Sequence, residues 1–494
     1  MNLNVIIKSL NHQTKATGWQ QWLPIAAVLV LAAILFFYRI EAEGLWIDEL
    51  SSINDAQEPS KLYTKNLLRP LYYALLMAWM SLGNSDAWLR SLSVIFAIIS
   101  VFLLYRLGRR LFGEVEGLIS ALLLALSPMF INHAQEIRMY ALSACLGLGG
   151  TLCLANVLLT EKPKAPGNAP MAGWFILRLL AMLTVPLNVT LLLPDVLLVW
   201  LRFRQQRASL FNFGKWLLVL LLLWSPCVLA VIQFASPTSE HAAHHVGRTP
   251  PGLDNVVRTL KFWTVWPFAV QANAIAATFY KLFTFMLAGL ISLTLFQRHK
   301  SPQLLWVAAW FALPLVPIFA FSYISIPLWV NRYLLFVSPY LFILLAFAIS
   351  RLWQQWRVAA LVVGITYLIA VSGGLVRYYT VQDRPDYKFI IQTIEQYEQP
   401  GDTIVWSRYY TKPLSWYYQG TAEVHVNPTI KVKSDLEISQ WLDQFPTPLS
   451  RLWLVLKVNE EIYPKFGQQL EEQFNFAKTF QYEQGSKVFL LTPK

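Results

Sequence analysis

Two adjacent carboxylates lie close to the end of the first long apolar segment of the chain. Residues 22–40 are apolar, and Trp46 precedes Asp48 and Glu49 shortly after them. One carboxylate at such a position can remove a proton from an acceptor hydroxyl or amine, while its neighbour holds the acceptor or changes the pKa of the first. The alternative is that both are solvated acids at the edge of a membrane.

Arginine recurs at the ends of other apolar segments. Arg138 stands two residues after Glu136, Arg69 precedes a Pro-Leu-Tyr-Tyr segment, and Arg332 precedes Tyr333. Arginine binds phosphate oxygens in pairs, so these residues are candidate phosphate ligands. A structural Glu136–Arg138 ion pair, and arginines that only anchor helices at the membrane surface, remain alternatives.

The composition excludes a soluble domain as the carrier of these residues. Of 494 residues, 56% are hydrophobic and 14% are charged, whereas a soluble domain has about 25% charged residues. The three cysteines fall in apolar segments, which predicts neither a disulfide nor a metal cluster. We expect no nucleic-acid partner, because excess Lys and Arg in a membrane protein mostly report orientation.

Apolar segments predict a polytopic α-helical membrane protein with about eleven spans. Residues 70–82 are too few to span and are expected to form a helix in the membrane interface, and 253–266 is a second candidate of that kind. Two predicted spans are short and meet near Pro186, so whether 172–203 crosses twice stays open. The spans are 22–40, 88–107, 115–132, 139–159, 172–185, 189–201, 216–235, 276–296, 304–321, 333–349 and 358–376.

Charge asymmetry predicts the orientation. With the N-terminus in the cytoplasm, the inner segments hold 15 basic and three acidic residues. The outer segments before the tail hold eight basic and ten acidic residues. This places the C-terminal tail outside the plasma (inner) membrane. It also places the candidate residues on one outer face, where carboxylates and arginines suit an anionic lipid head and a nucleophilic acceptor. These residues are Asp48, Glu49, Arg69, Glu136, Arg138 and Arg332.

The chain divides into a membrane module, 1–377, with outer loops at 41–90 and 236–275, and a tail, 378–494. The module has a net charge of +14 and the tail −2. The tail alternates helical and strand patterns and is expected to be a small α/β domain. It shows no nucleophile, base or metal pattern, so we expect it to select the acceptor, with aromatic residues near 409–410 and 416–418, and to perform no chemistry. The expected helices are 385–398, 434–445 and 460–473, and the strands are 402–406, 451–456 and 487–492.

Two further features stay open. His241, His244 and His245 have a spacing that could bind a metal on one helix face, but Ser, Thr, Gly and Pro around them favour a loop. We predict no metal and no cofactor. Asp195 lies inside a predicted span, where it either lines a lipid channel or sits near the membrane surface.

The segments from Trp46 to Leu159 resemble the C-type glycosyltransferase fold. They are most similar to the branch of protein O-mannosyltransferases, lipid A aminoarabinose transferases and their bacterial relatives. An Arg-Tyr-Leu at 332–334 and a small outer tail domain agree with that architecture. The matching segments are Trp46–Glu49, Pro70–Tyr73, Leu89–Arg90, Leu107–Gly113, Ala125–Pro128 and Gln135–Tyr140.

The resemblance implies a function and roles for residues. A polyprenyl-phosphate sugar would be the donor, used from the outer leaflet, and the sugar would pass to an extracytoplasmic acceptor with inversion. Asp48 would be the base, supported by Glu49, and Arg69 would contact the phosphate. Because they lie on the same predicted outer face, Arg138 and Arg332 are expected to join Arg69 as phosphate ligands. The acceptor cleft would be lined by Trp46, Tyr72, Glu136, Tyr140 and Tyr333.

Three other functions remain open from the sequence. A glycan polymerase or ligase would share the donor chemistry. A transporter or lipid flippase is disfavoured, because no internal repeat is visible and the polar residues gather at one face. A non-catalytic membrane scaffold for the tail is a third. The sequence does not specify the sugar, the acceptor or the oligomeric state.

Overall fold

The computed structural model describes most of residues 20–494 and divides them into two compact units. The first comprises 1–38, 60–79 and 90–378, and the second comprises 39–59, 80–89 and 379–494. Residues 39–59 and 80–89 thus group with the tail, although they lie between membrane helices in the sequence. The residues not described are 1–19, 65, 161–167, 236–249, 266–273, 297–300, 325–326, 382–383, 386, 407–410, 427–450, 458–467, 469 and 483–485.

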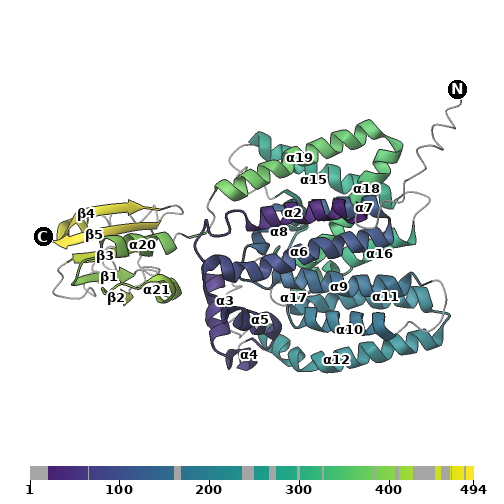
Figure 1. The fold of residues 1–494 in the computed structure, drawn as a ribbon, viewed down its shortest axis with the longest axis horizontal. Helices are drawn as coiled ribbons and strands as arrows, with labels where there is room; N and C mark the ends of the chain where they lie inside the picture. Colours follow the sequence, from purple (N-terminus) through teal and green to yellow (C-terminus); the bar gives the residue numbers. More distant parts are fainter. Residues whose placement is uncertain are drawn as a thin grey trace. The chain divides into compact units, whose positions relative to one another are not determined.

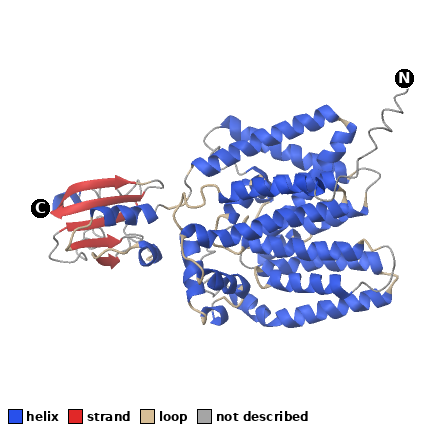
Figure 2. Ribbon diagram, in the orientation of Figure 1, coloured by secondary structure: helices blue, strands red, loops and turns tan. Residues whose placement is uncertain are grey.

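The first unit is helical (Figures 1 and 2). Long apolar helices form because every backbone polar group must be satisfied within a membrane-spanning segment. Its helices are α2 (Leu23–Phe37), α4 (Lys61–Thr64), α5 (Pro70–Met80), most of α6 (Asp86–Leu111), α7 (Glu114–Ala125), α8 (Pro128–Ala134), α9 (Tyr140–Leu158), α10 (Asn168–Met182), η2 (Pro186–Leu191), α11 (Leu192–Phe203), α12 (Arg207–Ala235), α14 (Leu253–Val265), α15 (Ala274–Leu295), α16 (Pro302–Ala312), α17 (Leu315–Ile324), η4 (Leu335–Val337), α18 (Ser338–Gln355) and α19 (Arg357–Thr380).

The described part of the chain contains nine helices long and apolar enough to cross a membrane, or ten if α7 and α8, bent by 65°, form one span. These match ten of the eleven predicted spans. The eleventh, 172–185, corresponds to α10, whose 15 residues are too few to meet the same length criterion. The predicted interfacial helices 70–82 and 253–266 form the separate helices α5 and α14. The chain is a multi-span membrane protein, as the sequence predicts.

Two glycines explain part of the Leu107–Gly113 segment. Gly113 precedes α7 with φ of +128°, a conformation that L side chains rarely adopt. A Cβ on Gly117 would lie 2.7 Å from the carbonyl oxygen of Tyr105, so glycine allows α6 and α7 to cross closely. Arg109 closes the same turn through an ion pair of 2.7 Å with Glu114. This segment is therefore a tight helix–helix turn.

The second unit is built on a five-stranded sheet of order β2-β1-β3-β5-β4. β1 pairs in parallel with β2 and β3, whereas β5 is antiparallel to β3 and β4. The predicted strands 402–406, 451–456 and 487–492 and the helix 385–398 are present, and the predicted helix 434–445 lies outside the described residues. The elements are α3 (Ile47–Gln57), α20 (Tyr387–Tyr397), β1 (Asp402–Trp406), α21 (Lys412–Tyr417), β2 (Glu423–Val426), β3 (Arg451–Lys457), β4 (Phe474–Gln481) and β5 (Ser486–Pro493).

The core of this unit lies on both faces of the sheet. Apolar side chains of α20 pack against β1 and β3 on one face, and Ile47, the first residue of α3, joins that cluster. Leu470 and Phe474 pack on the other face with alternate residues of β3 and β5. Alternation of buried side chains along each strand produces these two layers. The start of α3 is therefore held by the sheet domain.

Candidate active site

Asp48 and Glu49 occupy the first turn of α3, where the two carboxylates have different surroundings. Trp46 precedes the helix in extended conformation, and its backbone N–H donates to Glu49 Oε2 at 3.2 Å. Glu49 thus satisfies a backbone donor at the start of its own helix, as carboxylates in the first turn commonly do. Glu49 is fully buried, whereas Asp48 is half-buried. Of the two, Asp48 has the more accessible carboxylate.

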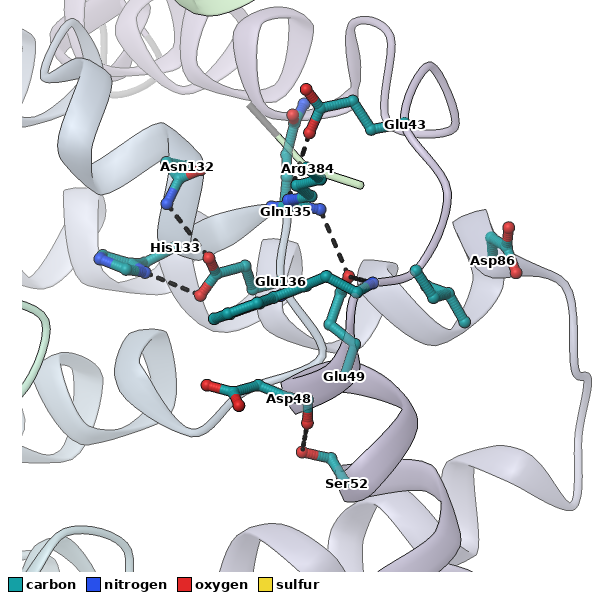
Figure 3. Close-up of polar contacts among 12 residues, drawn as sticks. Glu43, Asp48, Glu49, Ser52, Asp86, Asn132, His133, Gln135, Glu136 and Arg384 are labelled. Atoms are coloured by element: carbon teal, nitrogen blue, oxygen red, sulfur yellow. Dashed lines mark hydrogen bonds and ion pairs between the residues drawn. The ribbon is translucent and has the colours of Figure 1, made fainter. Parts of the chain in front are cut away.

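Arg384, at the beginning of the tail, lies beside the Glu49 carboxylate (Figure 3). Its Nη1 is 3.4 Å from Glu49 Oε2, and its Nε is 3.3 Å from Glu43 Oε2. Burial of a carboxylate is costly unless a cation or hydrogen bonds compensate it. The sequence does not reveal this role of Arg384, because no local spacing relates it to Glu49, 335 positions earlier.

Polar contacts within the same unit hold the loop around α3. The Asp86 carboxylate accepts from Lys388 Nζ at 2.9 Å and from the Tyr417 hydroxyl at 3.0 Å. Tyr417 in turn accepts from the backbone N–H of Leu45 at 2.8 Å. The Tyr418 hydroxyl donates to Glu398 at 2.9 Å. Tyr417 and Tyr418 therefore have structural partners, and 407–410 lies outside the described residues.

Glu136, in the first unit, is buried beside α8 and accepts from two neighbouring side chains (Figure 3). Its Oε2 is 2.8 Å from His133 Nδ1, and its Oε1 accepts from Asn132 Nδ2 at 3.2 Å. Glu136 thus orients His133. His133 is not among the residues predicted for the site. Its position three residues before Glu136 is the signal that could have found it, because this spacing places two side chains on one helix face.

The structure brings four of the predicted site residues together near the start of α9. The Arg138 guanidinium lies 5.8 Å from the centre of the Tyr140 ring, and that ring lies 6.4 Å from the Tyr333 ring. Arg332 is 5.6 Å from the centre of the Tyr333 ring. We call Arg138, Tyr140, Arg332 and Tyr333 the arginine–tyrosine cluster.

Arg69 and Tyr72 are placed by α5. The Arg69 guanidinium lies 5.8 Å from the Tyr73 ring, and among the described residues it has no hydrogen bond or ion pair. Tyr72 is fully buried, with its hydroxyl 3.5 Å from Ser93 Oγ, and Ser93 donates to the carbonyl oxygen of Arg138 at 3.1 Å. α5 is thereby connected to the backbone that carries the arginine–tyrosine cluster.

Asp195 belongs to a buried ionic network in the first unit. It forms an ion pair of 2.7 Å with Arg178, and both side chains are fully buried. The indole N–H groups of Trp174 and Trp310 also donate to its carboxylate, at 2.8 and 2.9 Å. These contacts join α10, α11 and α16. Asp195 therefore has a place in helix packing, and its burial does not fit a position that lines an open channel.

The described residues contain no group of three or more metal-binding side chains. His241, His244 and His245 lie outside the described part of the chain.

The fold is similar to that of solved membrane glycosyltransferases. The chain is similar to ArnT from Cupriavidus metallidurans, solved with undecaprenyl phosphate (13% identity, TM-score 0.56, covering 96% of this chain and 98% of that one) and in the apo state (13%, 0.58, 97% and 98%). It is also similar to the oligosaccharyltransferase AglB from Archaeoglobus fulgidus, solved with an inhibitory peptide and a dolichol-phosphate (12%, 0.54, 96% and 74%). The chain therefore has the C-type glycosyltransferase fold.

The match to a sequence family covers a shorter part of the chain than the structural similarity does. Residues 69–230 match the family described as dolichyl-phosphate-mannose-protein mannosyltransferase. This range includes Arg69, Tyr72, Glu136, Arg138 and Tyr140, and it confirms the resemblance predicted from the sequence. No curated protein matches the chain.

Proposed function

We propose that this chain transfers a sugar from a polyprenyl-phosphate carrier to an extracytoplasmic acceptor, with inversion at the anomeric carbon. The observation that carries the proposal is the arginine–tyrosine cluster at the start of α9, where two guanidinium groups flank a pair of tyrosines. A donor phosphate needs cationic contacts of this kind. ArnT was solved with undecaprenyl phosphate and AglB with a dolichol-phosphate and a peptide, which supports this donor and acceptor chemistry.

Asp48 is the proposed general base. Its carboxylate removes the proton from the acceptor hydroxyl or amine as the acceptor atom bonds to the anomeric carbon. The bond from that carbon to the phosphate oxygen breaks, and its electron pair stays on the phosphate. Glu49, buried and paired with Arg384, holds the first turn of α3 and does not need to exchange a proton. Trp46 fixes where this helix begins.

Arg138 and Arg332 are the proposed phosphate ligands, and Arg69 is a third. Each carries a charge that offsets the negative charge developing on the leaving phosphate. Tyr72 and Tyr333 support the phosphate-binding arginines through packing, Tyr72 by way of Ser93 and Tyr333 by its contact with Arg332.

The proposed orientation places the N-terminus in the cytoplasm and the tail outside the plasma membrane, because basic residues are concentrated in alternate connections. Cysteine labelling in intact cells tests it. A cysteine at 162 or 204 should stay unlabelled by a membrane-impermeant reagent, and one at 249 or at 419 in the tail should be labelled. A protected tail would contradict the orientation.

The function is tested with purified protein, a panel of polyprenyl-phosphate sugars and cell-envelope extracts, by detecting a sugar transferred to an acceptor. An Arg138→Ala variant should lose donor affinity as well as turnover. Arg202→Ala is a matched control, because Arg202 also packs on an aromatic ring, that of Phe203 at 5.8 Å, but at the far end of α11. Absence of transfer with every donor, or unchanged donor affinity in Arg138→Ala, would contradict the proposal.

A further inference from the structure

A groove opens between α10 and α12, two helices of the first unit that lie side by side (Figure 1). Its volume is about 590 Å³, within the roughly 300–1,000 Å³ that ligand sites usually have. Aromatic contacts join the two helices beside it, with the Trp174 and Phe213 rings 4.9 Å apart and the Phe175 and Trp216 rings 5.3 Å apart. The groove is lined by Ala169, Ala172, Asn212, Lys215, Trp216 and Val219.

The groove follows from the lengths and side chains of the two helices. α10 has 15 residues and is about 23 Å long, whereas α12 has 29 residues and is about 44 Å long. The hydrocarbon core of a bilayer is about 30 Å thick, so α10 cannot cover α12 over the whole membrane. At the start of α10, Ala169 and Ala172 present only methyl groups to α12, and they leave its face open.

Three polar side chains of α12 line this groove. Asn212, Lys215 and Trp216 are spaced by three and four residues, which places them on one face of the helix. Among the described residues, Lys215 has no ion pair, and its Nζ lies 4.6 Å from the centre of the Phe211 ring. Within the same described part of the chain, the Asn212 amide and the Trp216 indole N–H have no hydrogen bond. The groove therefore offers one cation and two further donors.

The charge around Lys215 is positive. Neither α10 nor α12 contains an acidic residue, and the connection from α11 to α12 adds Arg204 and Arg207. Asp195, the one acid of α11, is fully buried and paired with Arg178. Basic pockets between membrane helices bind the anionic head groups of lipids, and the apolar wall beside them accepts an acyl chain.

A second groove lies on another side of α12, against α11. Its volume is about 400 Å³, and among the described residues its lining is entirely apolar and includes Trp200 and Leu217. Lipid chains can fill such a groove whatever head group they carry. Selectivity for a head group is therefore expected only in the groove that contains Lys215.

We propose that the groove between α10 and α12 binds a phospholipid with an anionic head group. Lys215 pairs with the phosphate, Asn212 and Trp216 donate to oxygens of the head group, and an acyl chain lies along Val219, one turn further along α12. By the orientation proposed above, this lipid comes from the cytoplasmic leaflet. The site uses other helices than the arginine–tyrosine cluster, and it does not depend on the proposed sugar transfer.

The test measures lipid binding to the full-length protein in detergent by native mass spectrometry, with phosphatidylglycerol and phosphatidylcholine of identical chains. The wild type should bind the anionic lipid about fivefold more tightly or better, because one cation at a membrane surface contributes about that factor. Lys215→Gln should abolish this preference, and Lys215→Arg should keep it. Arg351→Gln is the matched control and should leave the preference unchanged. Arg351 is also exposed and packs on a ring four residues earlier, that of Phe347 at 5.1 Å, but it belongs to α18.

A variant that fills the groove tests the location. Ala172→Leu places a larger side chain in the groove without changing any charge, so it should weaken the binding of phosphatidylglycerol as Lys215→Gln does. A cysteine at 172 reports a different occupant, because a disulfide-linked dimer absent from the wild type would assign the groove to a second copy of the chain. That dimer, equal affinity of the wild type for both lipids, equal effects of Lys215→Gln and Arg351→Gln, or full binding by Ala172→Leu would each overturn the proposal.

Discussion

Replacing Arg384 with alanine should impair the positioning of the candidate base without weakening the binding of the lipid-linked donor. The substitution withdraws a cation that lies 3.4 Å from the fully buried Glu49 carboxylate and 3.3 Å from Glu43. Breaking a buried ion pair costs roughly 3–5 kcal/mol, and we take about 3 kcal/mol because both distances are long. This corresponds to a change on the order of 100-fold in the equilibrium that keeps the first turn of α3 in place.

The assay compares transfer rate, donor affinity and thermal unfolding. We expect Arg384→Ala to lower kcat at least tenfold and to leave the Kd for the lipid-linked donor unchanged, because the proposed phosphate ligands belong to the other unit. Arg39→Ala is the control, since Arg39 belongs to the same unit and is exposed, with one hydrogen bond to the carbonyl oxygen of Tyr379. It should change neither kcat nor the unfolding temperature appreciably.

A double variant separates positioning from a general loss of stability. Glu49→Gln removes the buried charge and keeps a side-chain oxygen that can accept from Trp46. Adding Glu49→Gln to Arg384→Ala should therefore restore part of the unfolding temperature, so the two effects should not add. An Arg384→Ala protein with the kcat and unfolding temperature of Arg39→Ala would refute this reasoning.

Three other outcomes are expected. Asp48→Asn should retain folding and lose transfer about 10²–10⁴-fold, measured as kcat against Glu49→Gln, and full activity would remove Asp48 from the base role. Asp195→Asn should lower the unfolding temperature markedly, because it weakens the counter-charge of the buried Arg178, and Arg178→Met with Asp195→Leu should recover part of it; a neutral single variant would contradict this. Burial of Glu398 acts to raise its pKa. Hydrogen bonds from Thr421, Tyr418 and Ala422 act in the opposite direction and outweigh burial, so the folded-state pKa of Glu398 lies below the usual value. The stability that this contributes is fully present above the unfolded pKa of about 4.5. It is lost as the pH falls through the lower pKa of the folded state. Tryptophan fluorescence of Glu398→Gln should show a smaller loss of tail stability in that acid range than the wild type, and equal losses would contradict the assignment.

The sequence predicts the membrane architecture well because the relevant information is local. An apolar run of about 20 residues must form a helix in lipid, and the segments that matched the family are mostly turns and helix contacts. The outer-face argument from the sequence includes Arg138 and Arg332, and the structure places these two in one cluster with Tyr140 and Tyr333.

The Arg178–Asp195 pair could have been found from the sequence. Arg178 stands eight residues before Pro186, and Asp195 stands eight residues after Leu187. A turn at 186–187 places positions equally distant from it opposite each other, so a hairpin aligns the two charges.

Strand β4 was missed for a different reason. Phe474, Phe476 and Phe480 suggest alternation, but the register shifts between Phe476 and Lys478 and interrupts the period of two. A bulge of this kind depends on the pairing partner, β5, and no local pattern reveals it. Arg384 is likewise invisible to local patterns, because its partners Glu43 and Glu49 are its neighbours only in the folded sheet domain.

The position of Arg384 changes the role that can be assigned to the tail. The sequence shows no catalytic constellation after residue 378, which favoured a tail that only selects the acceptor. In the structure, the tail supplies the cation beside Glu49, the strands that bury Ile47, and the tyrosine that binds the backbone of Leu45. A residue that holds a base in place need not touch the substrate to control the rate, because a small displacement of the base is enough to slow proton transfer. The tail therefore helps to hold the candidate base in place. A variant of the tail that changes acceptor preference must for this reason also be tested for displacement of α3.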